Sequence, residues 1–419
     1  MSLATLTVEV AFEKGLTETA ADGDFTTIST DNPVVQFRIT RGRGHELEVT
    51  QAGTATVICQ NTNGYLDPSN ESSPSPYYDG GNNVLPGRHL RIKAQDPETS
   101  TTYVVFRGFV ERWIQKYPGE TNQQTVIECA DAFKALALAF CDGSTEADDE
   151  NSGTRIANLL DQASWPSGAG YRDIDATAAN ETVPEKTYAT TGAVMAACQA
   201  IETAEIGSFF VSRSGAMTFK NRVNRISEFA TISATFSDTS TADGRLKYYG
   251  LDFSFDDTRI FNVINTKTDT DPVTTGTQQT DSTSQTRYGI RTKTNDSLML
   301  MAAGDATAWA QYIIGRQAEP ASRVKSITLR PDEQAGLWAK VLPAEIGNAY
   351  VVERTPAAGN EISHTVICER IQHTAMGANW VTTMQMSPAD TAGYWVLDDG
   401  SGTYAAYSKL SETTRLFFG

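Results

Sequence analysis

Polar and apolar residues alternate along the first part of the chain, from Leu3 to about residue 127, in a pattern that predicts β-strands. Six segments show it, among them "ATLTVEVAF", "GTATVICQN" and "YVVFRGFVERWIQ". Because successive side chains of a strand point to opposite faces, this alternation indicates strands with one face in a core. Gly, Pro, Asn and Asp cluster between the segments, as the turns of a barrel or sandwich require. A helical run, "DAFKALALAF", closes this unit.

The hydrophobic period changes between residues 142 and 223. In "TRIANLLDQA" and "GAVMAACQAIETAE" the apolar residues recur three or four positions apart, which predicts two helices that each bury one face. The segment "GSFFVSRSGAMTFKNR" then predicts a hairpin whose turn lies at Ser212 to Gly215. Two helices and a hairpin make a small α+β unit.

Strand-like segments return in the second half of the chain, and "AYVVERTP" and "WVTTMQMSP" are examples. One helix is predicted within "SLMLMAAGDATAWAQYIIGRQAEP", with Met301, Trp309 and Ile313 on one face. The polar segment from Thr268 to Thr286 predicts a long exposed hairpin tip or a mobile loop.

These patterns predict a mainly β chain with an α+β insertion. We expect a first β-barrel domain over residues 1–141, a small α+β domain over 142–230, and a second β-barrel domain with an inserted helix over 231–390. Residues 391–419 follow as a C-terminal interaction arm.

The arm is expected to dock because it is too short for a core of its own and too apolar to remain in water. Trp395, Leu416, Phe417 and Phe418 are among its large apolar residues and are its expected interface positions.

The charge of the chain limits its partners. The chain has 34 basic and 51 acidic side chains, which gives a formal net charge of −17. Such a surface repels nucleic acid, so specific DNA or RNA binding is disfavoured, and the charge otherwise favours solubility. No apolar run approaches the roughly 18 residues that a membrane helix needs, so we expect no stable membrane insertion. The start of the chain is typical of a strand rather than of a signal peptide.

The five cysteines are widely spaced and form no C-x-x-C pair. Their odd number and apolar neighbours, as in "ATVICQ", predict reduced thiols buried as small hydrophobic groups. This pattern indicates assembly in a reducing cytoplasm.

Candidate chemistry is weak throughout the chain. The segment "CQNTNG" places Asn61, Asn63 and Gly64 as in an EF-hand loop, but Cys59 and Asn70 stand where calcium needs carboxylates. The four histidines lack zinc-ligand spacing, and no nucleotide-binding or nucleophile motif appears. Adjacent acidic residues leave a glycosidase site open but favour solvated surface. We therefore expect no cofactor, no metal and no enzymatic activity.

The turn residues of the chain are more informative than its candidate chemistry. From Gln60 to Ile92 the sequence reads "QNTNGYLDPSNESSPSPYYDGGNNVLPGRHLRI". Asn63-Gly64 supplies the positive φ of a tight turn, and four prolines stiffen the excursion, which indicates a rigid structural corner. The basic segment "RITRGRGHE" favours a turn that makes ion pairs over a phosphate site.

These segments resemble the N-terminal region of minor tail proteins of long-tailed bacteriophages, which are similar to the baseplate hubs of contractile tails and secretion spikes. The resemblance lies in an RGR turn, a G-x-A-x-V strand, an N-x-x-G-x-x-DP-x-N loop, an SP-Y-Y segment, a PG-x-x-x-x-I segment and F-x-G-x-V-x-x-W. The matching residues are Arg41 to Arg43, Gly53 to Val57, Asn61 to Asn70, Ser75 to Tyr78, Leu85 to Ile92 and Phe106 to Trp113. Later segments, "EIGNAYVVERTP" and "TTRLFFG" among them, extend it over nearly the whole chain. An extra Ser75 and an insertion around Asp79 to Asn83 depart from it.

The resemblance implies two tail-tube-like β-barrel domains that flank the small α+β domain. It implies a structural virion protein, a tail-tip hub whose homotrimer forms a ring, closes the tail tube and connects it to a central spike or fibre. Its partners would be a distal tail or tail-tube ring protein, the tape-measure protein and DNA in transit through a central channel. The protein would be assembled in the host cytoplasm and reside in the virion tail.

The motif residues include no catalytic group, and we expect them to have structural or interface roles. They are Arg41, Arg43, Gly53, Asn61, Gly64, Asp67, Pro68, Asn70, Pro76, Tyr77, Tyr78, Pro86 and Gly87.

Two other functions remain open: a peripheral tail protein that binds a host surface receptor, and a tail-associated cell-wall hydrolase. A receptor binder would show an exposed aromatic cluster. Trp113, Trp309, Trp338 and Trp380 lie instead in regular patterns and are expected in the core. A hydrolase would need an appended segment larger than the one that follows the second barrel.

Overall fold

The computed structural model describes residues 3–70, 75–77, 83–119, 122–168, 170–177, 180–228, 231–239, 244–255, 257–270, 272–320, 322–358, 361–377 and 379–389. The chain forms two compact units. The first comprises Met1–Ser254 and Arg323–Ser387, and the second comprises Phe255–Ser322 and Pro388–Gly419. The division into domains that the sequence suggests remains a prediction.

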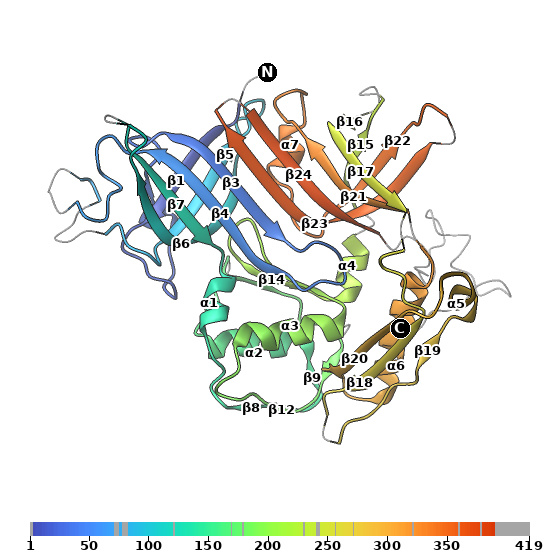
Figure 1. Cartoon of the computed structure of the whole chain (residues 1–419). Helices are drawn as coiled ribbons and strands as arrows, with labels where there is room; N and C mark the ends of the chain where they lie inside the picture. The colour runs from blue at the N-terminus through green and yellow to red at the C-terminus, as the bar shows by residue number, and fades with distance from the viewer. Residues whose placement is uncertain are drawn as a thin grey trace. The chain divides into compact units, whose positions relative to one another are not determined.

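Seven strands form the first half of the main sheet: β1 (Thr5–Ala11), β2 (Thr26–Thr27), β3 (Val34–Gly42), β4 (Gln51–Gln60), β5 (His89–Gln95), β6 (Thr102–Lys116) and β7 (Gln124–Ala130). Their order is β2-β1-β5-β6-β7-β4-β3, and the paired strands are antiparallel (Figure 1). In β4 Ala55, Val57 and Cys59 are buried between less buried residues. The strands predicted from alternation are therefore confirmed.

The second half of the sheet comes from β15 (Ile232–Ser237), β16 (Leu246–Lys247), β17 (Gly250–Phe255), β21 (Ser322–Leu329), β22 (Ala349–Arg354), β23 (Ile362–Met376) and β24 (Asn379–Pro388). Its order is β16-β15-β22-β23-β24-β21-β17. A short helix, α7 (Trp338–Val341), lies between β21 and β22 along the chain. The segments predicted as strands in this half are also confirmed.

The long strand β23 joins the two halves. Its residues Ile362 to Ile367 pair with β22, and its residues Arg370 to Met376 pair with β3. All these strands belong to one 14-stranded sheet. The expectation of two separate barrels is therefore wrong. The free edge of β3 pairs with β23, which joins the two halves into one sheet. Among the described strands, neither half closes into a barrel. The prediction of a mainly β chain is confirmed.

Two hydrophobic clusters fill the halves of the sheet. The first includes Phe37, Ile39 and Phe106, and it also contains Trp338 and Trp380 from the second half. The second is built from residues of the second half alone. Because the first cluster draws on both halves, side chains of the second half complete the core of the first.

The predicted tryptophan positions lie inside the protein. Trp113, Trp309, Trp338 and Trp380 are all buried, with Trp113 the most exposed at 9%. All five cysteines are free and buried. Both predictions are confirmed. In the part of the chain that the structure describes, no helix is long and apolar enough to span a membrane.

The α+β part of the first unit contains the helices α1 (Phe133–Leu138), α2 (Ser152–Gln162), α3 (Val194–Glu205) and α4 (Arg222–Glu228). A three-stranded sheet of β10 (Arg172–Ile174), β14 (Met217–Lys220) and β13 (Ser208–Val211) packs with them. The short strands β8 (Thr145–Glu146), β9 (Glu150–Asn151), β11 (Thr182–Val183) and β12 (Lys186–Thr187) form two small ladders. Figure 1 shows α2 and α3 side by side near the ends of the sheet strands.

Local sequence accounts for the α+β elements. The Asn151 side chain accepts hydrogen bonds from the N–H groups of Gly153 and Thr154 and so begins α2. The predicted hairpin turn is confirmed: the Gly215 N–H donates to the Ser212 carbonyl over 2.9 Å, and Gly215 has φ +94°. Glycine adopts this positive-φ backbone readily because it has no Cβ atom.

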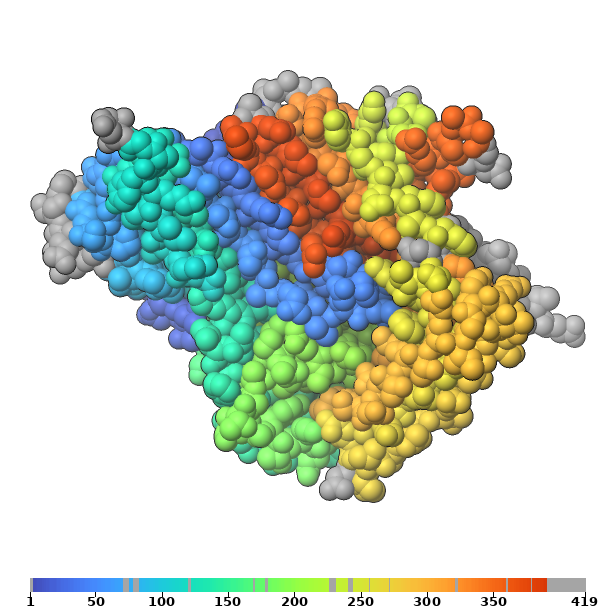
Figure 2. Space-filling model, in the orientation of Figure 1, coloured from blue at the N-terminus to red at the C-terminus, as the bar shows by residue number. Residues whose placement is uncertain are grey.

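The blue residues of β3, β4 and their connection lie in Figure 2 between the green α+β part and the red strands β23 and β24. The β3–β4 connection therefore lies where the three parts of the first unit meet.

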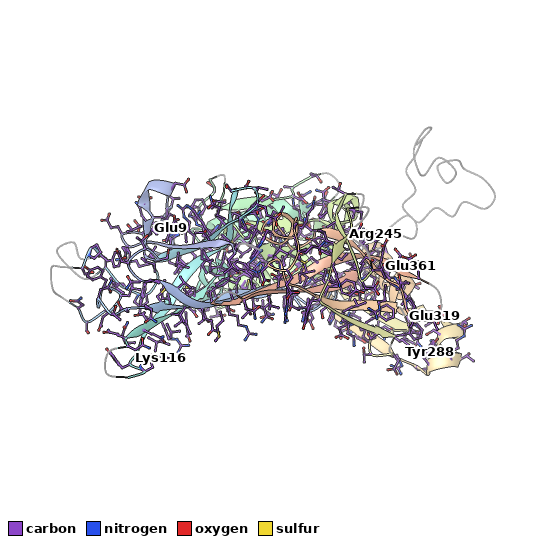
Figure 3. All side chains as sticks on the ribbon, turned by 90° about the horizontal axis from the view of Figure 1, so that it is seen from above. Glu9, Lys116, Arg245, Tyr288, Glu319 and Glu361 are labelled. Atoms are coloured by element: carbon purple, nitrogen blue, oxygen red, sulfur yellow. The ribbon has the colours of Figure 1, made fainter. Side chains whose placement is uncertain are left out.

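The second unit is a separate α/β layer. Its strands β18 (Val263–Thr268), β19 (Gln279–Thr280) and β20 (Thr292–Leu298) form one sheet, and α6 (Ala303–Gln317) packs on β18. The predicted helix and the burial of Trp309 and Ile313 on it are confirmed, whereas Met301 lies before the helix begins and is half-buried. Figure 3 shows Tyr288 and Glu319 next to each other, where the Tyr288 hydroxyl donates to a Glu319 carboxylate oxygen over 3.0 Å.

The prediction of a long exposed tip over Thr268 to Thr286 is confirmed only in part: described residues such as Val273 and Gln278 are exposed, but the segment is not a structureless tip. It contains β19 and the first part of α5 (Ser282–Tyr288). Thr268 is fully buried, and its hydroxyl lies 2.9 Å from the hydroxyl of Thr274. Because threonine hydroxyls bond to one another and to the backbone here, the polar composition does not require exposure.

Candidate functional site

The RGR turn forms the centre of the first unit. β3 ends at Gly42, whose φ of +101° and close neighbours permit no side chain. A Cβ atom there would lie 2.1 Å from the Glu369 carbonyl oxygen on β23. The next residue, Arg43, donates its N–H to that same oxygen over 2.9 Å. Gly42 therefore allows β3 to approach β23 closely.

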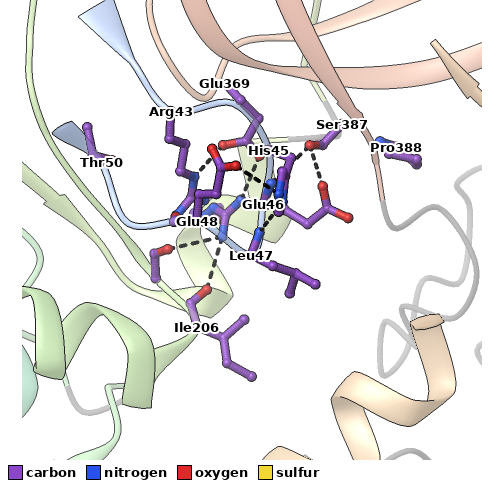
Figure 4. A network of polar contacts seen from close by, with 12 residues as sticks. Arg43, His45, Glu46, Leu47, Glu48, Thr50, Ile206, Glu369, Ser387 and Pro388 are labelled. Carbon is purple, nitrogen blue, oxygen red and sulfur yellow. Dashed lines mark hydrogen bonds and ion pairs between the residues drawn. The ribbon is translucent and has the colours of Figure 1, made fainter. Parts of the chain in front are cut away.

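Arg43 is buried between two carboxylates from different elements. Its Nε donates to Glu369 Oε2 over 2.7 Å, and its Nη1 lies 3.2 Å from Glu202 Oε1 on α3. Arg225 of α4 reaches the other oxygen of Glu369 over 3.3 Å. Figure 4 shows Arg43 beside Glu369, with the backbone of Ile206 nearby. The basic turn makes ion pairs, as its sequence predicts.

Arg41 makes a second set of contacts. Its Nη1 donates to Glu345 Oε1 over 2.6 Å and to the Val211 carbonyl over 3.3 Å. The other oxygen of Glu345 accepts the N–H of Arg213 over 2.8 Å. Arg41 thus connects β3 to the β13–β14 hairpin and to the segment before β22.

We call these residues (Arg41, Gly42, Arg43, Glu202, Arg225, Glu345 and Glu369) the RGR cluster. It joins both halves of the sheet and the α+β part. Each charge in it has an opposite charge nearby, which offsets the large penalty for burying an ion.

Burial sets the electrostatics of the cluster. Burial would lower the pKa of Arg43, but Glu369 and Glu202 outweigh it and raise that pKa. Burial raises the pKa of Glu202 to about 7, against the opposing effects of Arg43 and of the N–H of Phe209. The cluster therefore holds Arg43 charged, while burial makes the Glu202 carboxyl harder to ionise than an exposed glutamate.

A neighbouring carboxylate leaves no room for a side chain at residue 53. Its N–H donates to Asp131 Oδ2 over 2.6 Å, and a Cβ atom at residue 53 would lie 2.5 Å from that oxygen. Asp131 also accepts the N–H of Phe133, the first residue of α1. This contact ties the sheet to the first helix.

Asp131 provides a pH-dependent prediction. Burial raises the pKa of its carboxyl to about 7. The folded protein then keeps this proton after the unfolded chain has lost it, so stability falls as the pH rises from about 4 to about 7. Asp131→Asn removes that loss. We expect the free energy of unfolding of the variant, relative to the parent chain, to rise by on the order of 1 kcal/mol or more over this window.

Urea unfolding at about pH 5 and about pH 8 measures this difference. Asp142→Asn is the matched control, since Asp142 is exposed and Ser144 lowers its pKa below the window. A constant difference for Asp131→Asn at both pH values would show that this carboxyl does not titrate there.

The Asn/Gly/Pro loop is held by its own polar groups. Asn61 is fully buried, and its Oδ1 accepts the N–H of Leu66 over 3.0 Å. Gly64 has φ +71°, and its carbonyl accepts the Asn70 side-chain amide over 3.0 Å. Asp67 Oδ1 accepts from the N–H of Ser69.

The remaining loop residues lie at its far end and its exit. Pro68 and Pro76 are exposed, whereas the Tyr77 ring is buried and stacks on Phe12 with ring centroids 4.5 Å apart. Pro86 is exposed, and Gly87 has φ +81° where the chain enters β5. Tyr78, Trp395, Leu416, Phe417 and Phe418 lie outside the described residues.

The structure thus brings Arg41, Arg43 and Gly53 together, while the residues from Asn61 to Gly87 form a separate corner. The sequence reasoning missed Glu202, Glu345 and Glu369. One signal was available for Glu202, which follows Val194 by eight positions and so lies on the apolar face of α3. An acid on a buried helix face requires a buried partner.

No group of three or more His, Cys, Asp or Glu side chains among the described residues is placed to hold a metal ion. The arrangement of the RGR cluster holds parts together, and its carboxylates already face arginines.

Comparisons with known proteins agree on the fold. No family model and no curated protein sequence matches the chain. Among solved structures, a tail protein from Neisseria meningitidis MC58 is similar with a TM-score of 0.59 at 12% identity, over 93% of this chain and 97% of that one. The 43 kDa tail protein of prophage MuSo2 from Shewanella oneidensis gives 0.57 at 12% identity, over 93% and 98%.

A chain of a PdpA–VgrG complex is also similar, with a TM-score of 0.51 at 9% identity, over 93% of this chain and 65% of that one. The chain therefore shares its fold with phage tail proteins over most of its length. The resemblance inferred from the sequence motifs is confirmed at the level of the fold.

Proposed function

We propose that this chain is a structural tail protein of a phage-like particle, a tail-tip hub of which three copies form a ring that closes the tail tube. The fold shared with two tail proteins supports a role in a tail. The observation that carries the hub is an internal repeat in the sheet, which supplies two similar tube-like elements in each chain.

The repeat is visible in the strand order. In the first half β1-β5-β6-β7-β4-β3 are neighbours, and in the second half β15-β22-β23-β24-β21-β17 are neighbours. Taken in chain order, the six strands of each half occupy the same six places. The direction of the first pair differs, since β1 and β5 are antiparallel whereas β15 and β22 are parallel.

The backbone hydrogen bonds just before β5 in the first half and just before β22 in the second half also match. Gly87 donates its N–H to the Val110 carbonyl over 2.7 Å, and Gly347 donates to the Cys368 carbonyl over 2.8 Å. Both glycines have positive φ, at +81° and +93°. The next residues read Glu-Arg in both halves, at 111–112 and at 369–370. The two halves therefore correspond residue by residue around this point.

Two similar halves in each of three chains would make a ring of six tube-like elements. Such a ring would match a sixfold tube on one side and a threefold spike or fibre on the other. The proposed neighbours are a distal tail or tail-tube ring protein, the tape-measure protein and the central fibre or spike. Residues 391–419 are proposed as an arm that contacts one of these.

The proposed ring is structural and not enzymatic. The net charge of −17 would favour a channel that repels DNA and lets it pass without binding. The four tryptophans named above are buried, so none of them contributes to an exposed aromatic surface of the kind that a receptor binder uses.

Reconstruction of the tail tip from particles that carry this chain tests the proposal. We expect three copies around the tail axis, each contributing both halves of its sheet to the wall of the channel. Six copies, or a single copy away from the axis, would contradict the hub. Hydrolysis of peptidoglycan or polysaccharide by the purified chain would contradict the structural role.

A further inference from the structure

We infer that the open edge of β17 pairs with residues Glu111 to Lys116 of β6 in a second copy of this chain. This contact would repeat between chains the contact that β3 and β23 make within one chain. The inference deepens the proposed ring and rests on it.

The contact within the chain sets the pattern. β3 runs antiparallel to the second part of β23, from Gln36 opposite Met376 to Gly42 opposite Arg370. Its other edge pairs with β4. The edge strand β3 of the first half thus pairs with β23, the longest strand of the second half.

In the repeat, β17 occupies the place of β3. Leu251 and Phe253 of β17 pack against the core of the second half, as Phe37 and Ile39 of β3 pack in the core of the first. One edge of β17 pairs with β21, the counterpart of β4. Among the described strands none pairs with the other edge of β17, which is the edge that β3 offers to β23.

β6 occupies the place of β23. Both have 15 residues, and in both the preceding strand pairs with the first part alone. On β6 this pairing ends at Phe109, and within the described residues no further strand pairs with that edge toward Lys116. The edge that accepts β3 on β23 is therefore open on β6.

Side chains along the open edge of β6 are more exposed than their counterparts on β23, which β3 covers. Glu369 and His373, beside β3, are each 1% exposed. Their counterparts on β6, Glu111 and Gln115, are partly exposed, with the side chain of Glu111 at 39%. A partner strand on this edge would cover these residues.

Transferring the observed register identifies side chains that would face each other. Asp252 takes the place of Arg38, which lies opposite Thr374 on β23. Glu111 of β6 corresponds to Glu369 of β23, so Lys116, five residues later, corresponds to Thr374. Asp252 and Lys116 are both exposed, and neither has an ion-pair partner among the described residues. Opposite charges at facing positions stabilise a pair of strands.

Geometry also explains why the partner would be another copy. Within the described residues each chain offers one open edge on β17 and one on β6, so the contact joins unlike surfaces, head to tail. Such contacts form closed rings when the rotation between copies closes, and closure leaves no open edge to aggregate.

An engineered disulfide tests the inference. The chain that carries both Asp252→Cys and Lys116→Cys is oxidised, as purified chain and within tail particles. Facing residues of paired strands lie about 4.5–5.5 Å apart between Cα atoms, which suits a disulfide. The five native thiols are buried and unpaired. We expect covalent species of two and three chains on a non-reducing gel.

Mixing the two single variants should give crosslinked pairs, which shows that the bond joins different chains. The matched control pairs Asp252→Cys with Thr102→Cys, an exposed position on the β5-paired part of β6, and should give no crosslink. The absence of the disulfide from both purified chain and particles would overturn the inference. If three copies surround the axis without the disulfide, the hub stands and this pairing fails. If crosslinks form in the purified chain but particles lack the threefold ring, the pairing stands and the hub fails.

Discussion

Replacing Arg43 by Met is expected to destabilise the first unit by about 3–5 kcal/mol, because it leaves two buried carboxylates without their shared cation. Arg43 lies between Glu202 and Glu369, and all three side chains are at most 3% exposed. The methionine fills a similar volume but cannot pair with either acid. The loss should therefore appear as a large fall in the urea midpoint, with the slope of the transition unchanged.

The matched control is Arg112→Met, in which an exposed arginine loses its ion pair with Glu128. An exposed ion pair contributes about 0–1 kcal/mol, so this variant should unfold close to the parent chain. Equal midpoints for the two variants would mean that the RGR cluster contributes no more than a surface pair. A double variant that adds Glu202→Met to Arg43→Met should recover part of the loss, since it removes a carboxylate left without its arginine while Glu369 keeps its contact with Arg225.

Gly42→Ala is the second substitution with a large expected effect. Its Cβ atom would lie 2.1 Å from the Glu369 carbonyl oxygen, so β3 would have to move away from β23. We expect a loss of about 3 kcal/mol or more, because positive-φ strain and disruption of the β3–β23 pairing add together. Thermal or urea unfolding of the purified chain measures it.

Gly87→Ala separates these two causes. Gly87 also has positive φ, but a Cβ atom there would have no neighbour within 4 Å. Its substitution should cost about 1–2 kcal/mol, from backbone strain alone. If both alanine variants lost the same stability, the close approach of β3 to β23 would not be the reason for the glycine in the RGR turn.

Part of the site could be predicted from short motifs. The RGR turn, Gly53 and the loop from Asn61 to Asn70 were all identified from residues that are adjacent in sequence. Their backbone requirements are local, because a positive φ or a side-chain-to-backbone hydrogen bond within a turn involves residues a few positions apart. The partners of Arg43 could not be found in this way. Glu202 and Glu369 lie 159 and 326 positions away along the chain.

The polar segment after Thr268 shows the converse. Its composition predicted exposure, and the structure buries Thr268 and places β19 and α5 nearby. Hydroxyl groups can satisfy one another when the chain folds back, and composition alone does not record that.

The sequence by itself determined the strands, the helices of the α+β part and the hairpin turn at Gly215, because periodicity and turn chemistry act over a few residues. The tertiary structure alone decided that β23 pairs with β22 along one part and with β3 along the next. Alternation specifies which face of a strand is buried, but any exposed strand edge offers the same backbone groups to many partners. The choice among them depends on Gly42 and the buried charges around Arg43, which come together only in the folded chain.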